Sequence, residues 1–81
     1  MASNNNDPLS AEAQSLRLGR YRHFKGHDVT VIGVARHSED YTQEFVVYDH
    51  DGKLWIRPLA MFLENIDRNG YKCPRFKYLG D

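Results

Sequence analysis

The chain has 81 residues and carries 11 Lys and Arg against 11 Asp and Glu, so its formal net charge is zero. A chain of this length forms one small domain and buries only about 60% of the surface that its unfolded state exposes. The neutral balance argues against the domain-wide basic surface of a duplex-DNA binder, and the single cysteine excludes an internal disulfide. Association into a homo-oligomer remains as a common stabiliser, and we expect it.

Residues 1–16 are predicted to form a flexible N-terminal tail, since they include the polar run Asn4-Asn5-Asn6 and few apolar side chains. Residues 10–16 could still form a short helix with Ser10 as its N-cap. No apolar stretch follows a basic start, and no run approaches membrane-spanning length. We therefore expect neither a signal peptide nor a membrane segment, and the lone cysteine fits the reducing cytoplasm.

Four strands are predicted next, over residues 20–24, 29–36, 44–48 and 54–57, because these runs are rich in β-branched and aromatic residues. The second run is apolar on both faces near its middle. That pattern is typical of a strand that curls through a barrel, and Gly33 would be its bend or bulge.

Pro58 can begin a helical turn, because its missing N–H needs no partner there, and residues 59–63 continue at helical spacing. Asn69-Gly70 indicates a turn before a final strand over residues 73–78. Short strands, tight turns and one short helical turn are typical of small barrels. We therefore predict a mainly β fold in which residues 17–81 form a single SH3-like, half-open barrel of about five strands.

A β-hairpin is predicted where Asp51-Gly52 separates two apolar runs. The register that follows pairs Tyr48 with Trp55, Val47 with Ile56, and Val46 with Arg57. Side chains alternate across a strand, so the two faces of the hairpin can be separated. The face predicted to be core consists of Phe45, Val47, Leu54 and Ile56.

The other face of this hairpin carries Tyr48, Trp55 and Arg57, and it is predicted to point outward as a binding surface. A Trp-Tyr pair beside Arg can stack a planar ring and hold an anion, with about 1–3 kcal/mol for each stacked base. The same residue types also dominate subunit interfaces, so burial in a homodimer is the alternative.

Residues 21–25 interleave cations with rings, which suits phosphate binding together with base stacking. The alternative is that Tyr21 and Phe24 pack in the core while Arg22 and Lys25 extend into solvent.

His37 and Ser38 are adjacent, so on an extended chain they point to opposite faces and do not form a local nucleophile and base. His37 and Glu39 share a face and could contact a ligand or each other, while Ser38 could cap a turn. His23 or His37 could still activate a hydroxyl from elsewhere in the chain. The four histidines lack metal-ligand spacing, and no metal or cofactor is expected.

Six segments between residues 19 and 78 carry a resemblance to a known family. They are Tyr21-Arg22-His23-Phe24-Lys25-Gly26, Ala35-Arg36-His37-Ser38-Glu39, Val46-Val47-Tyr48, Leu54-Trp55-Ile56-Arg57-Pro58-Leu59, Met61-Phe62 and Pro74-Arg75-Phe76-Lys77-Tyr78. In this order they resemble a small bacterial and phage domain family of unknown function. The resemblance implies a compact, barrel-like, cytoplasmic domain without an established catalytic activity. Longer members carry extra residues between the positions that match Tyr48 and Trp55, so contacts made by that longer loop do not carry over.

These observations lead to a functional hypothesis: a non-enzymatic, oligomeric protein that binds a phosphate-bearing or nucleotide-like small molecule. In this hypothesis Trp55 and Tyr48 stack the base, and Arg22, Arg57 and Arg75 neutralise the phosphate. Further polar contacts come from His23, His37, Ser38 and Glu39. In a phage, such a protein could sequester a nucleotide immune signal in the host cytoplasm.

Two other functions stay open. One is an interaction module that binds a protein segment or single-stranded nucleic acid, as small barrels often do. The other is a small nucleotide hydrolase that acts through His23 or His37.

Overall fold

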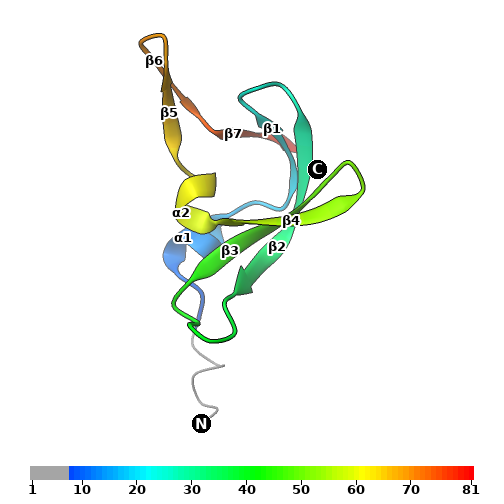
Figure 1. Ribbon diagram of the computed structural model, residues 1–81, viewed down its shortest axis with the longest axis vertical. Helices are drawn as coiled ribbons and strands as arrows, with labels where there is room; N and C mark the ends of the chain where they lie inside the picture. Colours follow the sequence, from blue (N-terminus) through cyan, green and yellow to red (C-terminus); the bar gives the residue numbers. More distant parts are fainter. Residues whose placement is uncertain (1–7) are drawn as a thin grey trace.

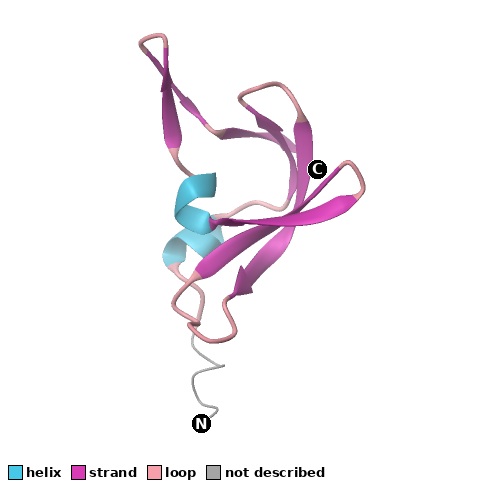
Figure 2. Ribbon diagram, viewed as in Figure 1, coloured by secondary structure: helices cyan, strands magenta, loops and turns pink. Residues whose placement is uncertain are grey.

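The computed structural model describes residues 8–81, which form seven strands and two short helices (Figures 1 and 2). Five strands make one antiparallel sheet in the order β4-β3-β2-β1-β7, and two make a separate hairpin. The elements of the larger sheet are β1 (Gly19–His23), β2 (Asp28–Arg36), β3 (Glu44–His50), β4 (Lys53–Pro58) and β7 (Phe76–Gly80). The hairpin consists of β5 (Asn65–Arg68) and β6 (Tyr71–Pro74), and the helices are α1 (Ala11–Ser15) and α2 (Leu59–Phe62).

The predicted mainly β fold is confirmed, and its five-stranded sheet curls without closing. The two edge strands, β4 and β7, are at opposite ends of the strand order and do not pair with each other. In Figure 1 the sheet bends around one side of the molecule, and α2 lies at the open side. Neither helix of the described residues is long and apolar enough to cross a membrane.

Both turns predicted from Asp-Gly and Asn-Gly are present. Asp51 and Gly52 have φ values of 58° and 77°, and Asn69 and Gly70 have φ values of 54° and 84°. Positive φ at both central residues is the geometry that two-residue hairpin loops require. The predicted register between β3 and β4 is confirmed, because Tyr48 pairs with Trp55.

The irregularity predicted at Gly33 is also present. The pairing of β2 with β3 shifts register between Val31 and Gly33, so Ile32 has no partner across the ladder. Such an extra residue increases the local twist of a strand, which helps the sheet to curl.

The predicted final strand over residues 73–78 is instead divided between β6, which ends at Pro74, and β7, which begins at Phe76. Pro74 has no N–H to donate to a ladder. The amide of Arg75 donates to the carbonyl oxygen of Glu64 at 2.9 Å, at the start of the smaller hairpin. The chain therefore changes sheet at this point.

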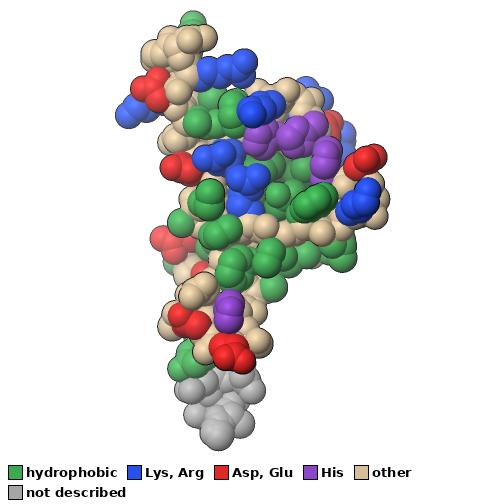
Figure 3. Space-filling model, in the orientation of Figure 1, with side chains coloured by type: hydrophobic (Ala, Val, Ile, Leu, Met, Phe, Trp, Pro, Cys, Tyr) green, Lys and Arg blue, Asp and Glu red, His purple; other side chains and the backbone are tan. Residues whose placement is uncertain are grey.

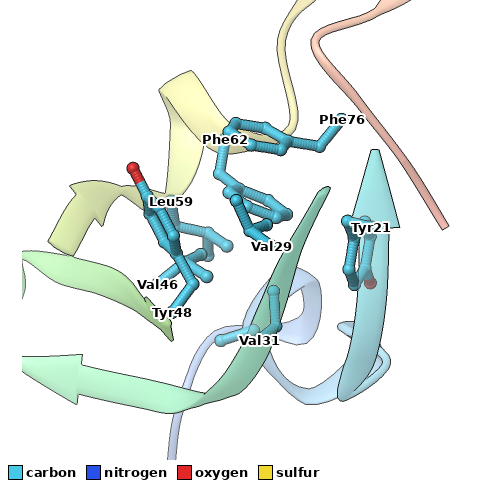
Figure 4. Close-up of a cluster of buried hydrophobic side chains, with 9 residues drawn as sticks. Tyr21, Val29, Val31, Val46, Tyr48, Leu59, Phe62 and Phe76 are labelled. Atoms are coloured by element: carbon cyan, nitrogen blue, oxygen red, sulfur yellow. The ribbon is translucent and has the colours of Figure 1, made fainter. Parts of the chain in front are cut away.

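The core fills the inner face of the curled sheet (Figure 4). Phe62 of α2 is 1% exposed and stacks on Phe76 of β7, with ring centroids 4.2 Å apart and an interplanar angle of 9°. Tyr21 meets the ring of Phe62 edge-on at 5.2 Å. The buried apolar residues are Ala13, Tyr21, Val29, Val31, Val46, Tyr48, Leu59, Phe62 and Phe76.

The predicted assignment of faces in the β3–β4 hairpin is wrong. Val46 is 0% exposed and Tyr48 is 8% exposed, whereas Leu54 and Ile56 are 64% and 61% exposed. The reason lies in α2, which follows β4 directly and covers the face of Val46 with its own Leu59 and Phe62. The aliphatic face predicted to be core is therefore the outer face of the sheet.

The short helix predicted near residues 10–16 is present as α1 with Ser10 as its N-cap. The Ser10 hydroxyl accepts a hydrogen bond from the amide of Ala13 at 3.1 Å and donates to Oε1 of Glu44 at 2.6 Å. Ala13 is 5% exposed and belongs to the core. From residue 8 onward, the segment assigned to a tail thus contacts the β domain, while residues 1–7 lie outside the described part.

Candidate functional site

Cationic and aromatic side chains gather on the inner face of the five-stranded sheet, next to the buried aromatic core. Alternation along the strands points His23 of β1 and Trp55 and Arg57 of β4 to the face that holds Tyr48. We call this group the inner-face cluster; it consists of His23, His27, His50, Trp55, Arg57 and Arg75. In Figure 3 histidine, lysine and arginine side chains border a patch of hydrophobic side chains on the viewed face.

Three imidazole rings form a row within the inner-face cluster. The rings of His23 and His27 stack with centroids 4.5 Å apart, and the ring of His27 lies 4.6 Å from that of His50. The β1–β2 turn places His27 there, because the amide of His23 donates to the carbonyl oxygen of His27 at 2.8 Å. The His50 Nδ1 atom lies 3.3 Å from the carbonyl oxygen of Asp28, which ties β3 to the same turn.

His23 is held in its neutral form. It is 7% exposed, and burial lowers the pKa of its imidazole from 6.5 to about 4, assisted by the nearby positive charges of His27, Arg57, Arg75 and Lys25. The amide of Lys25 donates to His23 Nδ1 at 3.2 Å. This hydrogen bond leaves the proton of the neutral ring on Nε2, so His23 offers a hydrogen-bond donor without a charge.

Arg57 and Arg75 each retain a buried donor without a partner. The Nε atoms of these two residues are the buried side-chain nitrogen or oxygen atoms that lack an acceptor within residues 8–81. The Arg57 guanidinium lies over the ring of Phe76 at 5.4 Å, and Arg75 Nη2 donates to Oε1 of Glu64 at 2.8 Å. An unsatisfied buried donor costs about 1–3 kcal/mol, more when charged, so an added anionic acceptor would be stabilised here.

Trp55 supplies an exposed ring beside these cations. Its side chain is 48% exposed, and its indole Nε1 donates to the carbonyl oxygen of His50 at 3.3 Å, which fixes the ring against β3. Tyr48, its cross-strand partner, is instead buried among Phe62 and Phe76. Of the two rings predicted to stack a ligand, only Trp55 has the exposed surface to do so.

The structure brings together five of the residues that the sequence suggested, namely His23, Tyr48, Trp55, Arg57 and Arg75. It separates Arg22 from them, because Arg22 points to the opposite face of β1 from His23 and its Nε donates to Oδ1 of Asp28 at 2.8 Å. That interaction lowers the pKa of the Asp28 carboxyl.

His37, Ser38 and Glu39 also lie apart from the inner-face cluster. They follow the end of β2, whereas His27 precedes its start. His37 Nδ1 accepts hydrogen bonds from the amides of Glu39 at 3.0 Å and Asp40 at 3.2 Å. These residues organise the β2–β3 loop, so the structure does not place them with the inner-face cluster.

Sequence reasoning missed His27 and His50. Each lies beside a hairpin turn. The alternation of side chains that assigns a strand residue to one face of a sheet does not extend through a turn. The turn signals at Gly26 and Asp51-Gly52 could only have shown that both histidines lie at ends of neighbouring strands.

Within the described residues, no group of three or more His, Cys, Asp or Glu side chains is arranged to hold a metal ion.

Comparisons with known proteins agree with this fold. A profile described as Protein of unknown function (DUF1653) matches residues 19–78. The crystal structure of a DUF1653 protein from Bordetella bronchiseptica is similar to this chain at 34% sequence identity, with a TM-score of 0.74. The alignment covers 84% of this chain and 92% of that one. No curated protein matches the sequence significantly.

Proposed function

The chain belongs to the DUF1653 family of proteins of unknown function, and from the geometry of its inner-face cluster we propose a role for it. In this proposal the chain is a non-enzymatic binding protein. Its ligand is a small molecule that carries both a phosphate group and a planar ring, as a nucleotide does. The observation that carries the proposal is the pair of buried, unpartnered Nε atoms of Arg57 and Arg75. Guanidinium groups bind phosphate oxygens through charge-assisted hydrogen bonds, so a phosphate that reached these side chains would supply the acceptors that they lack.

The surroundings of the two arginines suit the rest of such a ligand. Trp55 offers a half-exposed indole face on which a base can stack. His23, neutral above a pH of about 4, offers Nε2–H to a carbonyl or phosphate oxygen without adding a further charge. Compared with the set proposed from the sequence, the site loses Arg22, His37, Ser38, Glu39 and the buried Tyr48, and it gains His27 and His50.

Association into a homo-oligomer remains part of the proposal. Leu54 and Ile56 are each more than 60% exposed and lie on β4, an edge strand of the larger sheet. Exposed aliphatic side chains on an edge strand favour contact with a second chain. In a phage, an oligomer of this kind would bind a nucleotide immune signal of the host and keep it from its receptor.

The experiment that tests the binding role is native mass spectrometry of the purified protein before and after incubation with a nucleotide-rich cell extract. A stoichiometric small-molecule adduct is expected, and the same spectrum gives the number of subunits. Arg57→Gln and Trp55→Ala should both lose the adduct while keeping the wild-type circular dichroism spectrum.

Two variants serve as controls for this experiment. Arg20→Gln removes one positive charge from the outer face of β1, and His37→Gln changes the loop at the far end of β2. Both should retain the adduct. A protein that stays free of any adduct, or one whose adduct survives Arg57→Gln, would contradict the proposal.

A further inference from the structure

The β5–β6 hairpin, residues 65–74, extends from the rest of the molecule as a two-stranded arm (Figure 1). A side-chain bond from the last residue of β5 and a backbone bond at the base of the arm join it to Phe24, next to the β1–β2 turn. Nη1 of Arg68 donates to the carbonyl oxygen of Phe24 at 3.1 Å, and the Phe24 amide donates to the carbonyl oxygen of Arg75 at 2.9 Å. The arm is therefore held in one place relative to the larger sheet.

The register of the arm sorts its side chains onto two faces. Arg68 is opposite Tyr71 and Ile66 is opposite Cys73, so these residues share one face. Tyr71 is 77% exposed beside Arg68. The neighbouring pair, Asp67 and Lys72, lies on the other face, so the face of Arg68 carries no carboxylate.

The face of Arg68 borders a cavity of about 240 Å³ between the arm, the β1–β2 turn and β7. Its lining residues are Arg22, His23, Phe24, Gly26, Arg68, Cys73, Pro74 and Lys77. No acidic side chain lines the cavity, although Asp28 is bonded to Arg22 at its edge. Of the inner-face cluster, His23 lines this cavity, whereas Trp55 and Arg57 do not.

Positive charge is concentrated around this cavity although the whole chain is neutral. Arg22 and Lys77 are direct cross-strand partners, and the ion pair with Asp28 balances the charge of Arg22. The charged groups of Lys25 and Arg68 lie 5.9 Å and 5.7 Å from the ring centroid of Phe24. A bound anion would be attracted by the other cations of this region, Lys25, Arg68 and Lys77.

We propose that the face of the arm that carries Arg68 and Tyr71 binds single-stranded nucleic acid. Arg68 and Lys77 contact the phosphates, and the exposed ring of Tyr71 stacks a base. The combination of a cationic groove with an exposed aromatic ring is how proteins hold unpaired strands without reading their sequence. Base stacking requires an unpaired base, which favours a single strand over a duplex.

Fluorescence anisotropy with labelled oligo-dT and oligo-U of about ten nucleotides tests this proposal, because this length lies within the site sizes of small single-strand-binding folds. The full chain is expected to bind at low salt and to lose affinity as salt rises. Tyr71→Ala should weaken binding about fivefold or more through lost stacking. Lys77→Gln should weaken binding and reduce the slope of log affinity against log salt by about one.

Lys72→Gln is the matched control, because it removes the same charge from the opposite face of the same arm. It should bind as the wild type does. The absence of binding at low salt, equal loss in Lys72→Gln and Lys77→Gln, or equally tight binding of a duplex of the same length would each overturn the proposal. Loss of oligonucleotide binding in Trp55→Ala would instead place the strand on the inner-face cluster and would also overturn this proposal. Because Tyr71 and Trp55 belong to different proposed sites, each of the two proposals can be rejected without the other.

Discussion

His23 and His27 stack their imidazole rings nearly in parallel, at an interplanar angle of 12°. Burial, followed by the neighbouring His27, lowers the pKa of His23 to about 4. The folded protein therefore resists protonation at a residue that the unfolded chain protonates readily.

This difference predicts a loss of stability in acid. Between about pH 6.5 and pH 4 the unfolded chain binds a proton at His23 that the folded chain does not, so the free energy of unfolding falls as the pH falls through this range. The loss is on the order of 3 kcal/mol. Urea unfolding at a series of pH values measures it. His23→Gln should flatten the curve, His37→Gln should not, and an unchanged curve in His23→Gln would contradict the assignment.

Removal of the Phe62 ring should be the most damaging core change. Phe62 is 1% exposed and stacks on Phe76, so Phe62→Ala should lower the free energy of unfolding by about 3–5 kcal/mol. Leu63, the next residue, is 44% exposed, and Leu63→Ala should stay within about 0.5 kcal/mol of the wild type. Thermal or denaturant unfolding of both variants provides the comparison. Similar losses in the two would mean that α2 does not cover the core as described.

The orientation of the β3–β4 hairpin can be tested with one change on each face. Val46→Ala should lower the free energy of unfolding by about 2 kcal/mol, because Val46 is 0% exposed. Ile56→Ala removes more apolar surface but from a side chain that is 61% exposed, so its effect should be smaller. Urea unfolding of a dilute protein, below its association range, separates folding from any contact between chains. A larger loss of unfolding free energy in Ile56→Ala than in Val46→Ala would support the face assignment made from the sequence.

The bond between α1 and β3 should also contribute to stability. Ser10 caps α1 and donates to Glu44, and its hydroxyl and amide together lower the pKa of the Glu44 carboxyl. Ser10→Ala should cost about 1 kcal/mol at neutral pH, as loss of an N-cap does. The cost should shrink as the pH falls from the ordinary pKa of glutamate through the lowered pKa of Glu44, because the carboxyl that becomes protonated there accepts these bonds weakly. Ser15→Ala, at the other end of α1, is the control in a thermal unfolding series.

Features encoded by neighbouring residues could be predicted from the sequence. Asp51-Gly52 determined its hairpin and the register of Tyr48 with Trp55, and Gly33 marked the bulge. Each depends on backbone conformations that are available to few residue types.

The buried face of the hairpin could not be predicted in the same way. Both faces are apolar, and the choice depends on where α2 packs after Pro58. The site could not be predicted either, because it also depends on contacts between residues that are distant in the sequence. His27 and His50 meet only because two turns at the ends of adjacent strands come together, whereas His37 lies at the other end of β2.

Because β4 and β7 do not pair, no ladder of backbone hydrogen bonds joins the two edges of the curled sheet. Side-chain packing at Phe62 and Phe76, rather than a ladder of backbone hydrogen bonds, sets the distance between these edges. Arg57 belongs to one edge strand and Arg75 immediately precedes the other. An anion bound by both guanidinium groups would connect the β4 edge to the β7 edge. A ligand that binds more tightly would therefore also make the whole domain more rigid.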